Sequence, residues 1–383
     1  MPSRRILLIN HEYPPLGGVG GNATRHIARG LAKLGHKPYV LTTAWPGLPA
    51  LEERDGVVIK RIVSRRADMR SLGAGEGARF IANAMWIAQG LARQWKIDIT
   101  VPFFTLPAAP VALFLKRRRF IPYVLALQPG DVPRRRPRHA WTTEAQVHRG
   151  VRHLWHCASA VIAPSQNLAD TARGFAPAQA VDVIPYGADV DGITPKDDYQ
   201  SKGDVKLLYV GRLEKDRGLD VLLPALAKVS SALKWKLALV GDGPEWPVIA
   251  ALAARFAMID RIELAGWQGW NTLPPIYRGA DVFVLPSRVD GMPAALLEAM
   301  ASGLPVVSTC VAGVSEAVLD RQTGMLVPPD DSDAFADALT ELLVDPTRWE
   351  PMGRAGRARV ETYYSWTNVA EKWVAVIERV LAS

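Results

Sequence analysis

Short apolar segments alternate with amphipathic ones along the chain, and the alternation occurs twice. Short apolar runs bounded by polar residues favour buried strands, whereas apolar residues that recur every three or four positions favour helices. In the first half, the pattern predicts strands at 6–10, 38–42, 57–62, 97–101, 123–127 and 160–163. In the second half, it predicts strands at 206–210, 236–240, 262–264, 282–285 and 306–308.

Amphipathic segments separate these strands. Their spacing predicts helices at 23–34, 79–94, 219–230, 246–255, 293–301 and 333–343, and a terminal helix at 365–382. Strand–helix alternation is typical of an α/β fold with parallel sheets and helices on both faces. Because it occurs twice, we expect two doubly wound, Rossmann-like domains facing a central cleft. Such sheets bind ligands beyond the carboxyl ends of their strands.

A polar stretch over residues 192–204 separates the two halves. It contains Pro195, Gly203 and several charged residues, which is typical of a linker. The length of 383 residues also suits two domains better than one. We therefore expect an N-terminal domain over 1–195, a C-terminal domain over 196–364 and a terminal helical segment over 365–383.

Charge is distributed unevenly between the halves. The chain has 46 Lys and Arg against 38 Asp and Glu, a formal net charge of +8 at pH 7. Residues 1–195 hold 26 Lys and Arg against 13 Asp and Glu, a net charge of +13, so residues 196–383 carry −5. The asymmetry predicts an anionic partner for the first half.

We expect a cytoplasmic protein that at most rests on the inner face of a membrane. Residues 4–9 are too short for the apolar core of a signal peptide. The longest apolar run, 101–115, contains three prolines and is too short to span a bilayer. Two cysteines cannot form a disulfide framework, which suits a reducing compartment.

Two basic runs, Lys116–Arg119 and Arg134–Arg138, stand out in the first half. Trp86, Trp95 and Trp141 lie near them in the sequence and could insert into a membrane interface. Two interpretations stay open: a solvated surface, or contact with an anionic bilayer or a lipid-diphosphate acceptor. Nucleic acid is not expected, because no recognised binding fold accompanies the charge.

A glycine-rich segment, Tyr13–Gly21, follows the first predicted strand. Gly17 and Gly18 would let the backbone approach a ligand closely and leave N–H groups free for an anion. The segment matches neither the dinucleotide fingerprint G-x-G-x-x-G nor a P-loop, since no Lys-Ser/Thr pair follows. A plain strand-to-helix loop is the alternative.

The loop after the strand at 206–210 carries three cations. Of these, Arg212 and Arg217 are the candidates to clamp a diphosphate through charge-assisted, often bidentate hydrogen bonds. The alternative is a solvated loop with ion pairs to Glu214 and Asp216.

A third motif, over residues 286–300, joins a strand end to an apolar helix. Pro293 suits the first position of that helix, whose N–H groups and dipole favour an anion. Asp290 lies in the loop, and Glu298 is the one acid of the helix. A lone acid there needs a partner, either the hydroxyl groups of a ligand or a nearby arginine. Together the three motifs predict a site for a nucleotide diphosphate that carries a sugar.

In order and spacing, these motifs resemble those of the retaining GT-B glycosyltransferases of glycosyltransferase family 4. The matching pieces run from Asn10 to Trp366, and they further include Gly35-His36, Ile184–Asp189, Gly211–Leu213, Val240–Pro244, Leu296–Val307 and Gly324–Pro329. The resemblance implies a retaining hexosyltransferase that needs no metal or cofactor. It would use a nucleotide-diphosphate sugar to extend a polysaccharide, glycolipid or lipid-linked acceptor, with its terminal helix packed back on the first domain.

The resemblance also implies residue roles. Arg212 and Arg217 would neutralise the donor diphosphate. Glu298 would hold the ribose hydroxyls, and Asp290 the hydroxyls of the donor sugar. The other donor-binding positions would be Gly17, Gly18, Gly211, Gly241, Gly266, Trp267, Gly291, Met292, Pro293 and Ala294. On the acceptor side the candidates are Gln128 and Asp131.

Two positions depart from the family pattern. Asp290 stands where the family usually has Glu, which is one methylene longer. Gln128 stands where it often has His, and an amide cannot carry a proton. The family is thought to pass the acceptor proton to the leaving phosphate, so the missing His does not exclude catalysis. A non-catalytic nucleotide-sugar- or anion-binding protein on the same fold stays open, whereas the motifs give a phosphorylase or epimerase no support.

No metal site is expected. Two D-x-D sequences, at 189–191 and 331–333, lie at the linker and before a helix, and Asp331 or Ser332 suits the N-cap of that helix. A histidine-rich segment lacks zinc spacing and is typical of a helix with surface histidines: His148, His153, His156 and Cys157.

Overall fold

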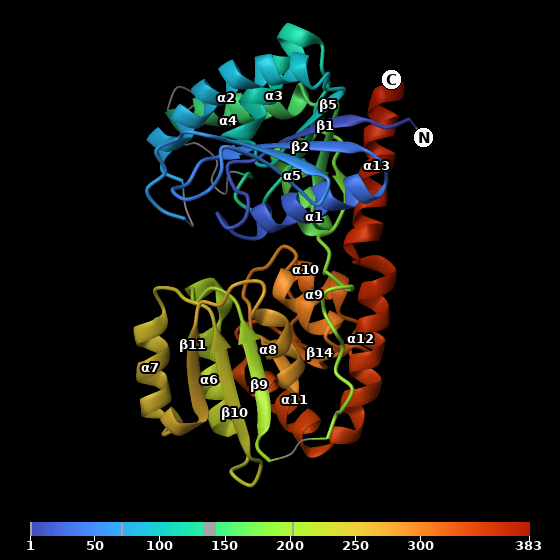
Figure 1. Ribbon diagram of the computed structural model, residues 1–383. Helices are drawn as coiled ribbons and strands as arrows, with labels where there is room; N and C mark the ends of the chain where they lie inside the picture. The colour runs from blue at the N-terminus through green and yellow to red at the C-terminus, as the bar shows by residue number, and fades with distance from the viewer. Residues whose placement is uncertain (1, 70–71, 133–142, 201–202) are drawn as a thin grey trace. The chain divides into compact units, whose positions relative to one another are not determined.

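The computed structural model describes residues 2–69, 72–132, 143–200 and 203–383. The chain divides into two compact units, which are coloured by residue number in Figure 1. Unit 1 comprises Met1–Tyr186 and Trp366–Ser383, and unit 2 comprises Gly187–Ser365. The basic run 134–138 and Trp141 lie outside the described residues.

Unit 1 is built on a sheet of order β3-β4-β2-β1-β5, which two parallel bridges join to a smaller sheet of order β6-β7-β8. Among the described pairings, β3 with β4 is antiparallel and the others are parallel. The strands are β1 Arg5–Ile9, β2 Lys37–Thr43, β3 Leu51–Arg54, β4 Val57–Ile62, β5 Ile99–Pro102, β6 Val124–Ala126, β7 Ala160–Ala163 and β8 Asp182–Val183.

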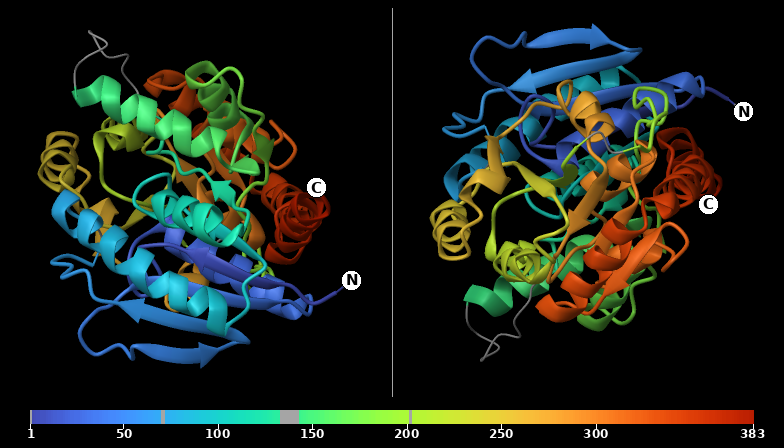
Figure 2. Two further views of the ribbon diagram at one scale, coloured as in Figure 1. Left: turned by 90° about the horizontal axis from the view of Figure 1, so that it is seen from above. Right: turned by 90° about the horizontal axis from the view of Figure 1, so that it is seen from below.

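Helices flank this sheet. They are α1 Val19–Lys33, α2 Ala74–Gln94, α3 Ala108–Arg119, α4 Thr143–His156, α5 Gln166–Phe175 and α13 Trp366–Ala382. Figure 2 shows α2, α3 and α4 side by side over unit 1, and Phe80 of α2 is buried with Leu7 and Ile9 of β1 in the core. On α4, His148 is 6% exposed and packs edge-on against Phe175, so the prediction of a surface histidine is wrong there.

Helix α13 completes unit 1 although it follows unit 2 in the sequence. It packs against α1 so closely that a Cβ added at Gly30 would lie 2.4 Å from the Cβ of Ala370. At its first turn, Trp366 stacks on His26 of α1, with ring centroids 4.9 Å apart. The apolar face that the sequence predicts for the terminal helix therefore has its partner within unit 1.

Unit 2 is built on one parallel sheet of order β11-β10-β9-β12-β13-β14. Its strands are β9 Val205–Val210, β10 Trp235–Val240, β11 Ile262–Gly266, β12 Val282–Leu285, β13 Val306–Thr309 and β14 Gly324–Val327. Its α-helices are α6 Leu219–Lys228, α7 Trp246–Arg255, α8 Leu273–Gly279, α9 Ala294–Ala301, α10 Ala312–Ala317, α11 Ser332–Val344 and α12 Trp349–Tyr363. Helix α6 packs against α7 and α11, and α9 packs against α12.

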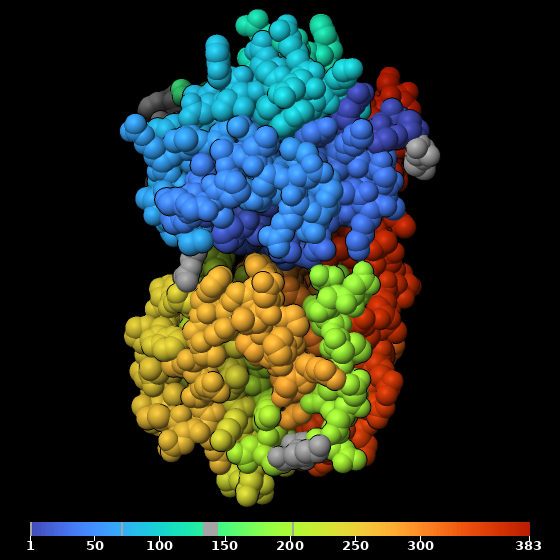
Figure 3. All heavy atoms as spheres, viewed as in Figure 1, coloured from blue at the N-terminus to red at the C-terminus, as the bar shows by residue number. Residues whose placement is uncertain are grey.

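Within unit 2, the segment 187–200 lies along the surface beside α12, as Figure 3 shows in yellow-green. The Arg357 guanidinium of α12 donates to the carbonyl oxygens of Val190 and Ile193, each at 2.8 Å. Lys196 pairs with the buried Asp281 at 2.6 Å. The segment is thus fixed to unit 2 by charged side chains.

Both sheets are doubly wound, which confirms the predicted α/β fold class with parallel sheets. In unit 1 the strand order turns back between β1 and β5, and in unit 2 between β9 and β12. Loops that leave the strands on either side of such a switch point diverge and open a crevice at the carboxyl ends, where these folds bind ligands. The two switch points are therefore the places to look for sites.

Candidate functional site

In unit 2, the loops after β9 and β12 touch each other at the switch point. The backbone N–H of Arg288 donates to the carbonyl of Asp216 at 2.9 Å. Gly218 has a φ of +68°, and a Cβ there would lie 2.0 Å from the carbonyl oxygen of Pro286. Only glycine combines this backbone conformation with so close an approach.

An ion pair joins the same two loops. The Arg217 guanidinium contacts the Asp290 carboxylate, and their side chains are only 22% and 8% exposed. Ser287 donates to the same carboxylate oxygen at 3.5 Å. Burial raises the pKa of Asp290 although Arg217 opposes the shift. The structure thus brings together two residues to which the sequence assigns separate roles.

Arg288 is a residue of this site that the sequence did not reveal. Its guanidinium makes a bidentate pair with Asp220 at 2.7 and 2.9 Å, and its Nε donates to Asp330 at 2.6 Å. It also donates to the carbonyl of Lys215, in the turn that carries Arg217. Arg288 therefore anchors the two loops that hold the Arg217–Asp290 pair.

Glu298 of α9 has a protein partner of a kind that the sequence did not suggest. The hydroxyl of Tyr277, on α8, donates to Glu298 Oε2 at 2.9 Å. The protein partner of this acid is therefore a buried tyrosine and not the arginine that the sequence suggested as the alternative to ligand hydroxyls. Burial raises the pKa of Glu298 to about 7, and the tyrosine hydroxyl opposes the shift. The carboxyl group is oriented by a neutral donor, which leaves its other oxygen for a second hydroxyl.

The other predicted donor residues follow strands of unit 2. Arg212 is on the surface, with a 71% exposed side chain that pairs with Glu214 at 2.8 Å. Trp267, after β11, is 63% exposed. The remaining positions end β11 or follow β9, β10 and β12: Gly211, Gly241, Gly266, Gly291, Met292, Pro293 and Ala294. All of these residues lie at the carboxyl edge of the sheet, and α9 begins among them at Ala294.

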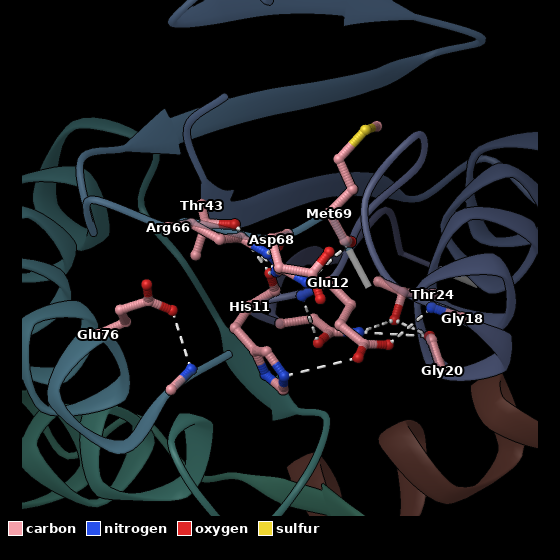
Figure 4. Close-up of polar contacts among 12 residues, drawn as sticks. His11, Glu12, Gly18, Gly20, Thr24, Thr43, Arg66, Asp68, Met69 and Glu76 are labelled. Atoms are coloured by element: carbon pink, nitrogen blue, oxygen red, sulfur yellow. Dashed lines mark hydrogen bonds and ion pairs between the residues drawn. The ribbon is translucent and has the colours of Figure 1, made fainter. Parts of the chain in front are cut away.

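In unit 1, the glycine loop lies at the other switch point, and Figure 4 shows its polar contacts. The prediction of free N–H groups is wrong here. The Gly17 N–H donates to the carbonyl of Met69 at 2.8 Å, and the Gly18 N–H donates to the Glu12 carboxylate at 3.2 Å. Glu12 folds back over the loop, since a Cβ at Gly17 would lie 2.5 Å from the Glu12 Cβ. A side-chain carboxylate therefore stands where the sequence predicts an incoming anion.

Gln128 is buried and Asp131 is half-buried, and both are hydrogen-bonded within unit 1. The hydroxyl of Tyr186 donates to Gln128 Oε1. Asp131 accepts the backbone N–H groups of Thr105 and Gln128, each at 2.8 Å, and so ties the loop after β5 to the loop after β6. Burial raises the pKa of Asp131 to about 7, against the effect of these hydrogen bonds. Both side chains hold loops together.

His11, directly after β1, is a second residue that the sequence did not single out. Its ring is 7% exposed and packs on Phe104, with centroids 4.7 Å apart. Its carbonyl oxygen accepts hydrogen bonds from Thr43 Oγ1 at 2.9 Å and Arg66 Nη1 at 2.8 Å. Burial, and then the positive charge of Arg66, lowers the pKa of His11 to about 3. The imidazole is therefore neutral at physiological pH.

The described part of the chain holds neither a metal cluster nor a membrane-spanning helix. No group of three or more His, Cys, Asp or Glu side chains there could hold a metal ion. Within the same residues, no helix is long and apolar enough to cross a membrane. Asp331 caps α11 by accepting the N–H groups of Asp333 and Ala334, which confirms the N-cap prediction.

Two family models match the chain. The model described as "Glycosyltransferase Family 4" matches residues 17–192, and the model described as "Glycosyl transferases group 1" matches residues 204–345. The two matches fall in different halves of the sequence and do not overlap.

Two relatives from Mycobacterium tuberculosis match almost end to end. One is a GDP-mannose-dependent alpha-(1-6)-phosphatidylinositol monomannoside mannosyltransferase, 27% identical over 390 residues, which cover 96% of each chain. The other is a glycogen synthase, 27% identical over 387 residues, which cover 96% of this chain and 92% of that protein.

Solved structures share the fold. Sucrose-phosphate synthase from Thermosynechococcus elongatus superposes with a TM-score of 0.83 at 23% identity, over 99% of both chains. Anabaena HepE, solved in complex with UDP and glucose, superposes with a TM-score of 0.76 at 18% identity, over 98% of this chain and 100% of that one.

Proposed function

The chain belongs to the group 1 glycosyltransferases of glycosyltransferase family 4, and we propose that it is a retaining hexosyltransferase that needs no metal. The observation that carries the proposal is the cluster at the unit 2 switch point. There a half-buried arginine, the buried carboxylate of an aspartate and a helix N-terminus lie at the carboxyl edge of one sheet, with Glu298 on that helix. Such a set suits a nucleotide diphosphate that carries a sugar, since guanidinium groups bind phosphates and carboxylates bind hydroxyls.

In the proposed mechanism, positively charged side chains stabilise the leaving diphosphate. Arg217 and Arg212 stabilise the charge that grows on the diphosphate as its bond to the anomeric carbon breaks. The acceptor oxygen forms its bond to that carbon on the same face, and its proton passes to the departing phosphate oxygen. Positive side chains thus do the work of a metal ion.

The acidic side chains and the backbone bind the hydroxyl groups of the donor. Glu298, oriented by Tyr277, holds the ribose hydroxyls. Asp290 and the backbone of 291–294 hold the sugar. The remaining proposed donor contacts are Gly17, Gly18, Gly211, Gly241, Gly266 and Trp267.

The test is a thermal-shift screen against UDP, GDP, ADP and their sugar forms, followed by NMR of the product from a labelled donor. Binding to the native state raises the melting temperature, so the screen identifies the base and the sugar. GDP-mannose comes first because a 27% identical relative is named for it. Transfer with retained anomeric configuration, undiminished by EDTA, supports the proposal. Inverted product overturns the mechanism, and binding without turnover indicates a non-catalytic nucleotide-sugar-binding protein.

We further propose that the acceptor is anionic or lipid-linked and reaches the protein at a membrane surface on the cytoplasmic side. Helix α3 ends in the basic run Lys116–Arg119, and Phe120, which follows it, is 89% exposed. Trp86 on α2 is 84% exposed, whereas Trp95 stacks on Tyr39 inside unit 1. Exposed aromatic rings beside cations suit the headgroup region of an anionic bilayer.

Vesicle co-sedimentation tests this surface. Wild-type protein should bind vesicles of phosphatidylglycerol and phosphatidylcholine and release them as salt is added. The Phe120→Ser and Trp86→Ser variants should bind less, whereas Val344→Ser, at a 64% exposed position in unit 2, should not change binding. Equal binding by all variants, or none by the wild type, removes the membrane proposal and leaves the transferase proposal standing.

A further inference from the structure

The unit 1 switch point holds a polar group that its neighbours do not satisfy. His11 follows β1 and Phe104 follows β5, so the two rings meet where the strand order of this sheet turns back. Crevices of this kind bind ligands in doubly wound sheets. The Nδ1 atom of His11 is buried and has no hydrogen-bond partner among the residues that the structure describes. A buried polar atom without a partner asks for an explanation, and a ligand is one.

The surroundings fix the ring in place. Its backbone carbonyl is held by two donors, Thr43 and Arg66, and its ring contacts Phe104 at an interplanar angle of 56°. Its Nε2 lies 3.7 Å from Glu12 Oε1, as Figure 4 shows. The carboxylate favours the tautomer with the proton on Nε2, which leaves the lone pair of Nδ1 as a hydrogen-bond acceptor. A preorganised, uncharged acceptor of this kind suits a hydroxyl group.

Two other acceptor groups near this crevice, the amide oxygen of Gln128 and the carboxylate of Asp131, already accept hydrogen bonds. Gln128 Oε1 accepts from Tyr186, and both carboxylate oxygens of Asp131 accept backbone N–H groups. Gln128 nevertheless lies close to the Phe104 ring, because a Cβ added at Gly20 would lie 2.9 Å from that ring and 3.2 Å from Gln128 Oε1. His11 is therefore the better candidate to meet a substrate at this edge.

We propose that His11 is a positioning residue for the acceptor, and that its Nδ1 accepts a hydrogen bond from an acceptor hydroxyl at the crevice between the loops after β1 and β5. This inference rests on the proposed transferase function and names a contact for its acceptor. His11 does not take the proton of the acceptor, because burial and then Arg66 lower the pKa of its imidazole to about 3 and make it a very weak base. The charged groups that face the ring are Glu12 and Arg66.

The test uses two substitutions that separate the ring nitrogens. His11→Asn puts an amide oxygen where Nδ1 lies, and His11→Gln puts a polar atom where Nε2 lies. The reactions are transfer from GDP-mannose and UDP-glucose to octyl α-mannoside, octyl β-glucoside and free myo-inositol, with donor hydrolysis as the internal control. His11→Gln should lower kcat/KM for the acceptor at least tenfold, and His11→Asn less than threefold. Donor hydrolysis should stay within twofold in both.

A second readout is the pH profile. Between pH 5.5 and 8, any rise or fall in the kcat/KM of the wild type for the acceptor should also be present in His11→Asn. A rise or fall that His11→Asn removes would make His11 a titrating base and overturn the proposal. Equal losses in both variants, a parallel loss of donor hydrolysis, or no loss in His11→Gln would also overturn it. So would a wild type that hydrolyses the donor and uses none of the acceptors, whereas a wild type inactive toward every donor would overturn the transferase function itself.

Discussion

Both units have doubly wound sheets, but the chemistry of their switch points differs. In unit 2, the loops after β9 and β12 are joined by a buried ion pair, Arg217 with Asp290. In unit 1, the loops after β1 and β5 meet through His11 and Phe104, both neutral at physiological pH. Phosphates need cations, whereas hydroxyl groups need only hydrogen bonds. The difference teaches that one architecture is fitted to different ligands by its loops alone.

The largest expected effect is the loss of the Arg217 guanidinium. Arg217→Ala should lower transfer by about 100-fold or more, because a group that stabilises the leaving charge is gone. It should also destabilise the protein by about 3 kcal/mol, because Asp290 stays buried without its partner. Arg212→Ala should lose transfer without loss of stability, since that side chain is 71% exposed. Donor turnover and urea unfolding measure the two effects, and full turnover in Arg217→Ala would rule out the charged crevice.

The second prediction concerns the pH dependence of stability, to which one acid in each unit contributes. The pKa of Asp131 in unit 1 and of Glu298 in unit 2 is raised to about 7, so the folded protein binds more protons than the unfolded chain. The stability that each group contributes is full below about pH 4 and is lost as pH rises to about 7, on the order of 3 kcal/mol per group.

Urea midpoints from pH 4 to 8 measure this slope. Asp131→Asn and Glu298→Gln should each flatten the fall relative to the wild type. If only one substitution flattens the fall, the pKa values of the two acids in the folded protein differ. An unchanged slope in both would contradict the raised pKa values.

A third prediction tests whether donor binding depends on the combined side-chain length of the ion pair. Arg is one bond longer than Lys, and Asp is one bond shorter than Glu, so Arg217→Lys with Asp290→Glu keeps the combined length. Each single change should weaken donor binding about tenfold, and the double change should recover most of the loss, a coupling of about 2 kcal/mol. Donor affinity by calorimetry gives the cycle. Simple addition of the single effects would mean that the two side chains act independently.

The smallest expected effect comes from the carboxylate beside the glycine loop. Glu12→Gln removes a negative charge next to the Gly18 N–H. If that N–H meets the donor diphosphate, UDP or GDP should bind two- to fivefold more tightly, about 0.5–1 kcal/mol. Glu53→Gln, on the exposed strand β3, is the matched control. Unchanged or weaker binding in Glu12→Gln would remove the glycine loop from the donor site.

The sequence predicted the framework of both sheets because buried strands such as β1 and β12 are continuous apolar runs. Strand β3 escaped prediction because its residues, Leu51–Arg54, are mostly polar and exposed. It pairs only at the edge of the sheet, so no hydrophobic pattern marks it.

The site was predictable where one loop carries its residues, as with Asp290 and Glu298. It was not predictable where partners come from distant segments. Arg288 is separated from its partner Asp220 by 68 positions, and Glu298 is separated from its partner Tyr277 by 21. His11 carries no signal beyond its place after a strand, because a single histidine there is common in many folds. Its unsatisfied nitrogen exists only once Glu12, Arg66 and Phe104 surround it.

Helix α13 has a consequence for how the protein is made. A ribosome completes the strands of unit 1 first and then synthesises the inserted residues, Gly187–Ser365, before it reaches α13. At about 5–20 residues per second, that interval lasts roughly 10 to 40 s. During this interval, α1 has left the ribosome without α13, the helix that covers Gly30. Unit 1 is therefore started before unit 2 but completed after it. Newborn chains should therefore be most open to chaperones and proteases at α1, while unit 2 already has its complete sheet.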